Sequence, residues 1–188
     1  MSDFEFLFAM FGLMLGLSLA EVLSGLARSL EERLQPRPAL RIGVLTPLLA
    51  SFVLLDLLSF WGAAWTVRNL VRVSGESLLL VTVFAGSYYM AARLVFPRDL
   101  EAVKSLDEHF FRIRRLVIGI LLALLAAQMA WYSTLPELAP RLLRPLSLGL
   151  TLLLAALMIL GMTLRSPRWL TVVLAALVAR YVLGYLLL

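Results

Sequence analysis

The sequence contains no cysteine and only one histidine. Without cysteine the chain has no disulfide, no thiolate nucleophile and no cysteine-based metal site. The single histidine, His109, has Glu108 beside it, but the side chains of adjacent residues diverge on a helix and do not share a metal ion. We therefore expect no metal site and no cofactor.

Several motifs with known chemistry are also absent. There is no HExxH motif and no glycine-rich phosphate loop. There is no TVGYG-like filter and no series of regularly spaced arginines of the voltage-sensor kind. The net charge of +5 does not indicate nucleic-acid binding, because the arginines lie at the ends of apolar segments and not on one polar face.

Hydrophobic residues are abundant, at 62% of the chain, whereas soluble domains have about 45–50%. They fall into six segments of about 20 residues, the length that crosses a bilayer as a helix. Continuous apolar runs favour helices over barrel strands, which alternate. We predict an all-α, polytopic membrane protein with one domain, 1–188, and six transmembrane helices. The predicted spans are Phe4–Ala27, Gly43–Thr66, Ser77–Phe96, Ile113–Trp131, Leu142–Leu164 and Trp169–Leu188.

The distribution of basic residues predicts the orientation, because cytoplasmic loops carry an excess of Arg and Lys. Most of the 17 basic residues belong to the first, third and fifth loops. These are Arg28, Arg33, Arg37, Arg41, Arg93, Arg98, Lys104, Arg112, Arg114, Arg115, Arg165 and Arg168. The sequence therefore predicts a multi-pass protein of a bacterial-type inner membrane, with both termini on the outer, periplasmic side.

The third loop is the longest polar segment. Its apolar residues recur at steps of three and four: Leu100, Val103, Leu106, Phe110 and Ile113. This spacing predicts a short amphipathic helix on the inner leaflet that continues into the fourth span. Its basic cluster of Arg112, Arg114 and Arg115 is a candidate site for anionic lipid head groups. The alternative is a plain connecting helix with ordinary basic flanks, which is the commoner case.

Asp56 lies near the middle of the second span, where a carboxylate costs roughly 2.5–3.5 kcal/mol on insertion scales. Arg180 lies at a similar depth in the sixth span and cannot lose its proton. Two opposite charges at one depth on different helices predict a contact between Asp56 and Arg180.

A second pair is expected nearer the inner surface. Glu21 in the first span and Arg93 in the third lie at comparable depth, and Arg28 competes for Glu21 at a spacing of seven residues.

Both pairs have a structural interpretation, as clamps that select one packing, and a functional one, as a polar pathway for protons, ions or a small substrate. The other polar residues at this depth extend such a pathway or join helices. They are Ser51, Ser59, Ser87, Tyr88, Tyr89 and Gln128.

The first span also carries small residues at every fourth position: Gly12, Gly16, Ala20 and Ser24. Such a stripe lets another helix approach closely. A helix of the same chain is the preferred partner, and a second subunit or another membrane protein is the alternative.

The leading functional hypothesis is a transporter or channel, or a subunit of one, with a buried polar core of Asp56, Arg180, Glu21 and Arg93. The alternative is a structural or interaction protein that packs against a partner or against itself. A lipid-modifying membrane enzyme is a weaker alternative. The partners that the sequence predicts are membrane lipids, together with a second copy or a partner protein at the first helix.

Overall fold

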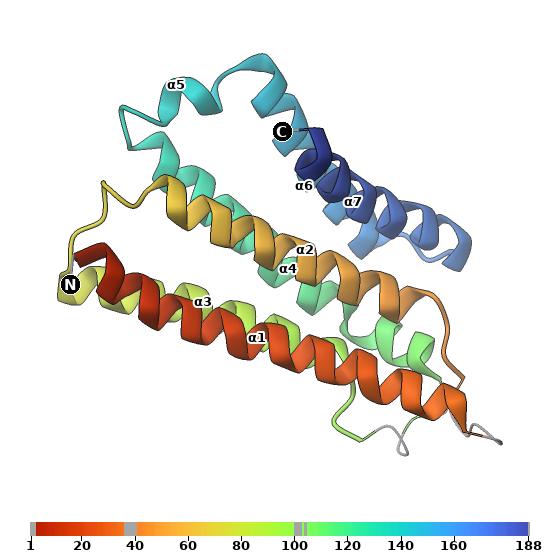
Figure 1. Cartoon of the computed structure of the whole chain (residues 1–188). Coiled ribbons are helices and arrows are strands. Elements are labelled where there is room, and N and C mark those ends of the chain that lie inside the picture. The colour runs from red at the N-terminus through yellow and green to blue at the C-terminus, as the bar shows by residue number, and fades with distance from the viewer. Residues whose placement is uncertain (1–2, 36–40, 100–102, 104, 188) are drawn as a thin grey trace.

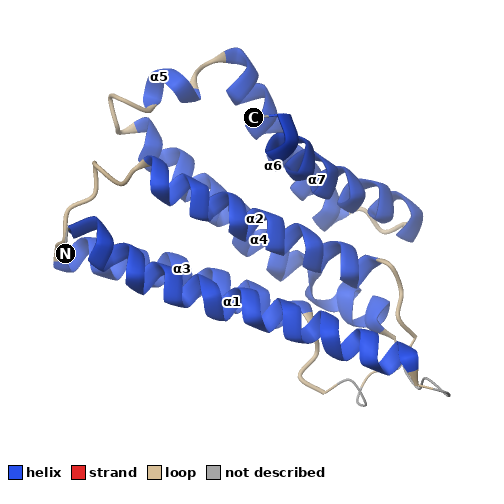
Figure 2. Ribbon diagram, viewed as in Figure 1, coloured by secondary structure: helices blue, strands red, loops and turns tan. Residues whose placement is uncertain are grey.

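The computed structural model describes residues 3–35, 41–99, 103 and 105–187. Within these residues the chain is helical (Figure 2). The helices are α1 (Asp3–Leu34), α2 (Leu45–Thr66), α3 (Gly75–Val95), α4 (Leu106–Ser133), α5 (Ala139–Leu142), α6 (Pro145–Thr163) and α7 (Pro167–Leu187). Six of them, all but the short α5, are long and apolar enough to cross a membrane.

The six predicted spans correspond to these six long helices, but the bounds differ. Helix α1 continues seven residues past the predicted end at Ala27, and α4 begins seven residues before the predicted start at Ile113. The polar sequence from Leu106 thus forms the first turns of α4. The rest of the predicted loop helix includes Leu100, which lies outside the described residues. Helix α5 was not predicted.

Local chemistry explains where several helices begin. Ser74 and Ser77 form a reciprocal capping box at the start of α3, in which each side chain accepts from the other residue's backbone N–H. Ser105 caps α4 by accepting from the N–H of Asp107. Helices α6 and α7 begin at Pro145 and Pro167, where a missing N–H costs nothing.

Successive long helices run in opposite directions and pack as two rows of three (Figure 1). One row is α1, α2 and α7, and the other is α3, α4 and α6. The chain begins and ends at the same end of the bundle, which we call the termini end. The opposite end, where α1 leads into α2, is the arginine-rich end. Helix α2 lies centrally and contacts α1, α3, α4 and α7.

The buried residues form one apolar core along the facing sides of these helices. Large apolar side chains also cover the outward faces, for example Leu13 on α1, Leu79 on α3 and Leu152 on α6. An apolar exterior on helices of this length suits acyl chains as the surrounding solvent. The fold is therefore that of a multi-pass helical membrane protein.

Candidate functional site

The carboxylate of Asp56 lies at the centre of the bundle, and the residue is only 8% exposed. Tyr88 of α3 donates a hydrogen bond to its Oδ2 at 2.7 Å, and Tyr181 of α7 donates to its Oδ1 at 2.5 Å. Both carboxylate oxygens thus have a donor, as a buried acid requires. Asp56, Tyr88 and Tyr181, which we call the tyrosine clamp, connect α2 to a helix on each side.

The predicted Asp56–Arg180 pair is wrong, because no ion pair joins these two described residues. The Nε of Arg180 donates to the backbone oxygen of Leu150 on α6 at 3.2 Å, and its guanidinium lies over the ring of Tyr181. Adjacent helical residues point about 100° apart, so only one of the two faces Asp56. Tyr181 takes that position, and Arg180 turns toward α6.

An aromatic layer covers the tyrosine clamp on the side of the termini end. The ring of Tyr88 packs against Phe60 and Phe84, at centroid distances of 5.4 and 5.8 Å. Phe60 and Phe84 stack on each other at 4.3 Å, and Phe11 of α1 packs against Phe60. Rings from α1, α2 and α3 therefore separate Asp56 from the space beyond.

That space is a cavity of about 530 Å³ between α1, α2, α3 and α4, which we call the termini-end cavity. Phe60 and Phe84 form part of its wall, which is largely apolar. Among its polar wall residues, Gln128 donates to the hydroxyl of Tyr132, which donates to the backbone oxygen of Ala63. Gln128 and Tyr132 thus bond to each other and to the backbone of α2, and most of the remaining wall is carbon surface.

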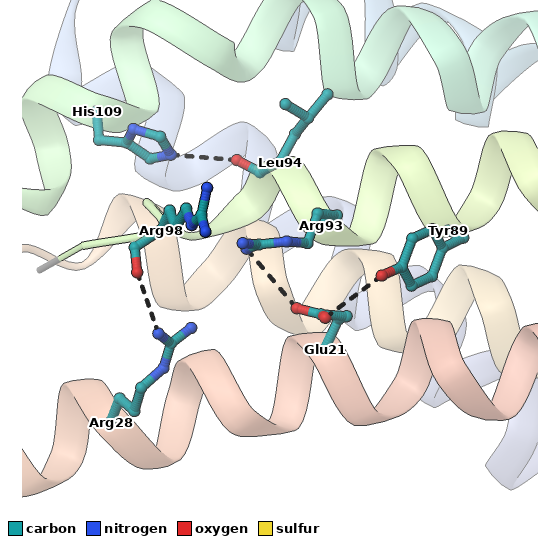
Figure 3. A network of polar contacts seen from close by, with 7 residues as sticks. All are labelled: Glu21, Arg28, Tyr89, Arg93, Leu94, Arg98 and His109. Atoms are coloured by element: carbon teal, nitrogen blue, oxygen red, sulfur yellow. Dashed lines mark hydrogen bonds and ion pairs between the residues drawn. The ribbon is translucent and has the colours of Figure 1, made fainter.

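A second polar group lies nearer the arginine-rich end (Figure 3). Arg93 of α3 lies 3.7 Å from the carboxylate of Glu21 on α1, so the predicted pair forms. Tyr89 donates a longer hydrogen bond of 3.5 Å to the same carboxylate. Both charged side chains are about one-third exposed, at 36% and 31%. Consecutive tyrosines on α3 thus contact the two acids, Tyr88 reaching Asp56 and Tyr89 reaching Glu21.

The other contacts in Figure 3 hold the C-terminal end of α3. Arg28 of α1, the expected competitor for Glu21, donates instead to the backbone oxygen of Arg98. A ring nitrogen of His109 lies 3.1 Å from the backbone oxygen of Leu94 in the last turn of α3. The carbonyl of Leu94 is among the last of α3, which lack partners in their own helix, and His109 of α4 lies beside it. Arg28 contacts the segment that follows α3.

The three arginines proposed to bind lipid head groups have different environments. Arg114 is 3% exposed and donates to the backbone oxygen of Gly161, near the end of α6. Arg115 donates to the backbone oxygen of Met162. Arg112 is 72% exposed in its side chain and lies 4.0 Å from Glu108. The interpretation was wrong for Arg114, since this basic side chain, about two turns inside α4, caps the neighbouring helix α6.

The small-residue stripe of α1 faces outward. Gly16, Ala20 and Ser24 are exposed, and a methyl group added at Gly16 would meet nothing within 4 Å. Of the two glycines in the stripe, Gly12 is the one that approaches another helix, at Trp61 of α2. The preferred partner, a helix of the same chain, is therefore wrong for most of the stripe. The close approach occurs at Gly25, where an added methyl group would overlap the ring of Phe96.

Sequence reasoning missed Tyr181 and assigned its role to Arg180. Both residues lie at the right depth, and depth alone does not say which of two adjacent residues faces the bundle. Tyr88 was named only as one of several polar residues. The signal for both tyrosines was their position at mid-span, level with a buried acid that needs donors.

No protein-family model, no curated protein and no solved structure matches this chain.

Proposed function

We propose that this chain is a small membrane transport protein in which a proton on Asp56 controls the movement of helices. The observation that carries the proposal is the tyrosine clamp. One mid-span carboxylate holds a helix on each side of α2, through Tyr88 of α3 and Tyr181 of α7.

The hydrogen bonds that a carboxyl group can make depend on whether it is protonated. Ionised, it only accepts, and it suits two tyrosine donors; protonated, it must itself donate one hydrogen bond. Gaining a proton therefore requires one tyrosine to turn its hydroxyl or withdraw. Transporters commonly work by rocking one group of helices against another. Besides the two hydrogen-bonded tyrosines, Arg180 and Tyr185 of α7 lie near enough to interact electrostatically with Asp56 without contacting it.

The positions of the cavity and the second acid support a pathway through the bundle. Phe60 and Phe84 line the termini-end cavity and also pack against Tyr88 of the tyrosine clamp. Toward the other end, Tyr89 follows Tyr88 and contacts Glu21, which Arg93 joins near the surface. Ionisable groups inside a membrane span typically mark such pathways.

The absence of cysteine makes a direct test of helix movement practicable. Spin labels on Leu79→Cys and Leu186→Cys, both exposed, report the distance between α3 and α7 at the termini end. In nanodiscs at pH 5 and pH 8 we expect two distance populations whose ratio changes with pH. Asp56→Asn, which keeps the shape but does not titrate, should give the same ratio at both pH values. An unchanged ratio in the unsubstituted chain would refute the proposed coupling.

A flux measurement tests transport itself. Proteoliposomes with a trapped pH indicator and a potassium gradient, to which valinomycin is added, should acidify faster than empty liposomes. Asp56→Asn should abolish the excess rate, while Thr171→Val, which removes a hydroxyl near the other end of α7, should retain it. If the flux equals that of empty liposomes, the chain does not move protons.

A second candidate function is assembly with another membrane helix, and the exposed stripe of Gly16, Ala20 and Ser24 favours it. Small residues on an outward face permit the closest contact between helices. Gly16→Leu should abolish a specific complex, measured by cross-linking in membranes, whereas Leu13→Ala on the same exposed surface should not. Equal cross-linking of the unsubstituted chain and of both variants would show that this surface is not the interface.

A further inference from the structure

We propose that the termini-end cavity binds one acyl chain of a zwitterionic phospholipid, with Arg72 and Glu76 contacting its head group. The juxtaposition that supports this is an apolar cavity inside a membrane bundle with two opposite charges at its mouth. The inference is independent of Asp56 and of the proposed proton step.

The first argument is the size and chemistry of the cavity. Its volume of about 530 Å³ falls within the roughly 300–1,000 Å³ of small-molecule sites. The cavity is open to the exterior, so a molecule from the surroundings can enter it. Water needs two to four polar partners, and the apolar part of the wall, away from Arg72 and Glu76, supplies few of them. For helices surrounded by lipid, the abundant apolar molecule at hand is an acyl chain.

The second argument is the pair of charges at the mouth. Arg72 and Glu76 line the cavity and are exposed. Neither side chain has a hydrogen bond or ion pair among the described residues, and they do not pair with each other. A guanidinium binds phosphate with directional hydrogen bonds, and a carboxylate binds an ammonium group. A phosphoethanolamine head group carries both charges on one short unit.

The third argument is that the segment carrying these charges is held in place. The hydroxyl of Ser77 donates to the backbone oxygen of Arg72 at 2.9 Å. Ser77 also belongs to the capping box that fixes the start of α3 with Ser74. Glu76 lies between these two serines, so the backbone on both sides of it is anchored. A preorganised mouth lowers the entropic cost of binding.

Native mass spectrometry with palmitoyl-oleoyl phosphatidylethanolamine tests the cavity. We expect one lipid to remain bound to the unsubstituted chain in detergent. Ala127→Phe places a ring in the cavity that Ala127 lines and should weaken binding at least about tenfold. Ala126→Phe is the matched control, because this exposed neighbour does not line the cavity, and it should bind as the unsubstituted chain does.

If Ala127→Phe fails to fold, Leu80→Trp narrows the cavity from the exposed side of α3 and should have the same effect. Equal binding in a folded filled variant and in the Ala126→Phe control would place the lipid elsewhere and overturn the site.

The head-group assignment has its own readout. Arg72→Gln should weaken phosphatidylethanolamine and phosphatidylglycerol alike, by about tenfold, the loss expected for one charge-assisted hydrogen bond. Glu76→Gln should weaken phosphatidylethanolamine only, because phosphatidylglycerol has no ammonium group. Equal or tighter binding of phosphatidylglycerol by the unsubstituted chain would overturn the zwitterionic assignment. These outcomes are independent of proton flux, so this site and the proposed transport fail separately.

Discussion

Tyr181 on α7 donates a hydrogen bond to Asp56 on α2 across 2.5 Å, although 125 positions separate the two residues in the chain. The last helix is thereby joined to the centre of the bundle by a polar contact in a largely apolar interface. Leu174 and Leu177 on the same helix are fully buried and supply the apolar part. The apolar residues bring α7 to the bundle, and the hydrogen bond favours one rotation of the helix about its axis.

We expect Tyr181→Phe to lower the free energy of unfolding by about 1–2 kcal/mol, because one oxygen of Asp56 then lacks a donor. Tyr88→Phe should have a similar effect from the other side. The measurement is reversible unfolding in detergent. Tyr185→Phe is the control: this exposed tyrosine makes no hydrogen bond to Asp56, and its loss should change stability by less than about 0.5 kcal/mol.

The triple variant Asp56→Leu with Tyr88→Phe and Tyr181→Phe separates stability from function. Replacing a whole buried polar group by apolar residues of similar volume is often neutral or stabilising. We expect this variant to be about as stable as the unsubstituted chain and to show no pH-dependent change in the distance between α3 and α7. A retained pH dependence would mean that Asp56 is not the group that responds.

Two glycines of α1 should respond oppositely to the same substitution. A methyl group at Gly25 would overlap the ring of Phe96, which is buried. Gly25→Ala should therefore lower the free energy of unfolding by about 1–3 kcal/mol through overpacking. Gly16→Ala meets nothing within 4 Å and should be neutral, or stabilising by up to about 1 kcal/mol through helix propensity. Similar losses at both positions would contradict the packing of α1 against Phe96.

The comparison of these glycines shows what the sequence reveals and what it hides. The six long helices are predictable because length and hydropathy decide them. The rotation of each helix is not, since a membrane helix is apolar on all sides and the usual amphipathic signal is weak. The regular stripe of Gly12, Gly16, Ala20 and Ser24 suggested the packing face, but the packed residue is Gly25. Only tertiary contacts distinguish the two faces.

The polar residues show the same division. Depth along the span was sufficient to pair Glu21 with Arg93, because both side chains are long and tolerate different helix rotations. It was insufficient for Asp56, whose short side chain reaches only the residue directly facing it. The rotation of α4 also decides the direction of its basic side chains: Arg114 faces the end of α6, and Arg112 faces the exterior.

Arg114 and Arg112 should therefore differ in their contributions to stability. Arg114→Met leaves the backbone oxygen of Gly161 without its donor at 3.2 Å and should cost about 1–3 kcal/mol. Arg112→Met removes a largely exposed side chain 4.0 Å from Glu108 and should cost less than about 0.5 kcal/mol. Thermal unfolding in detergent measures both. If Arg112 proves the more costly loss, the capping role assigned to Arg114 is wrong.

A double-mutant cycle tests the ion pair of Glu21 and Arg93. The single variants are Glu21→Gln and Arg93→Gln, and the cycle isolates the energy of their interaction. Because both side chains are about one-third exposed and 3.7 Å apart, we expect a coupling of about 0.5–1 kcal/mol. The coupling should fall at high salt, which screens partly exposed charges.

The matched cycle on Glu108 and Arg112 joins two residues of one helix that are twice as exposed, and it should give a smaller coupling. A coupling at Glu21 and Arg93 that is zero, or no larger than in the matched cycle, would show that this pair does not contribute to holding α1 against α3.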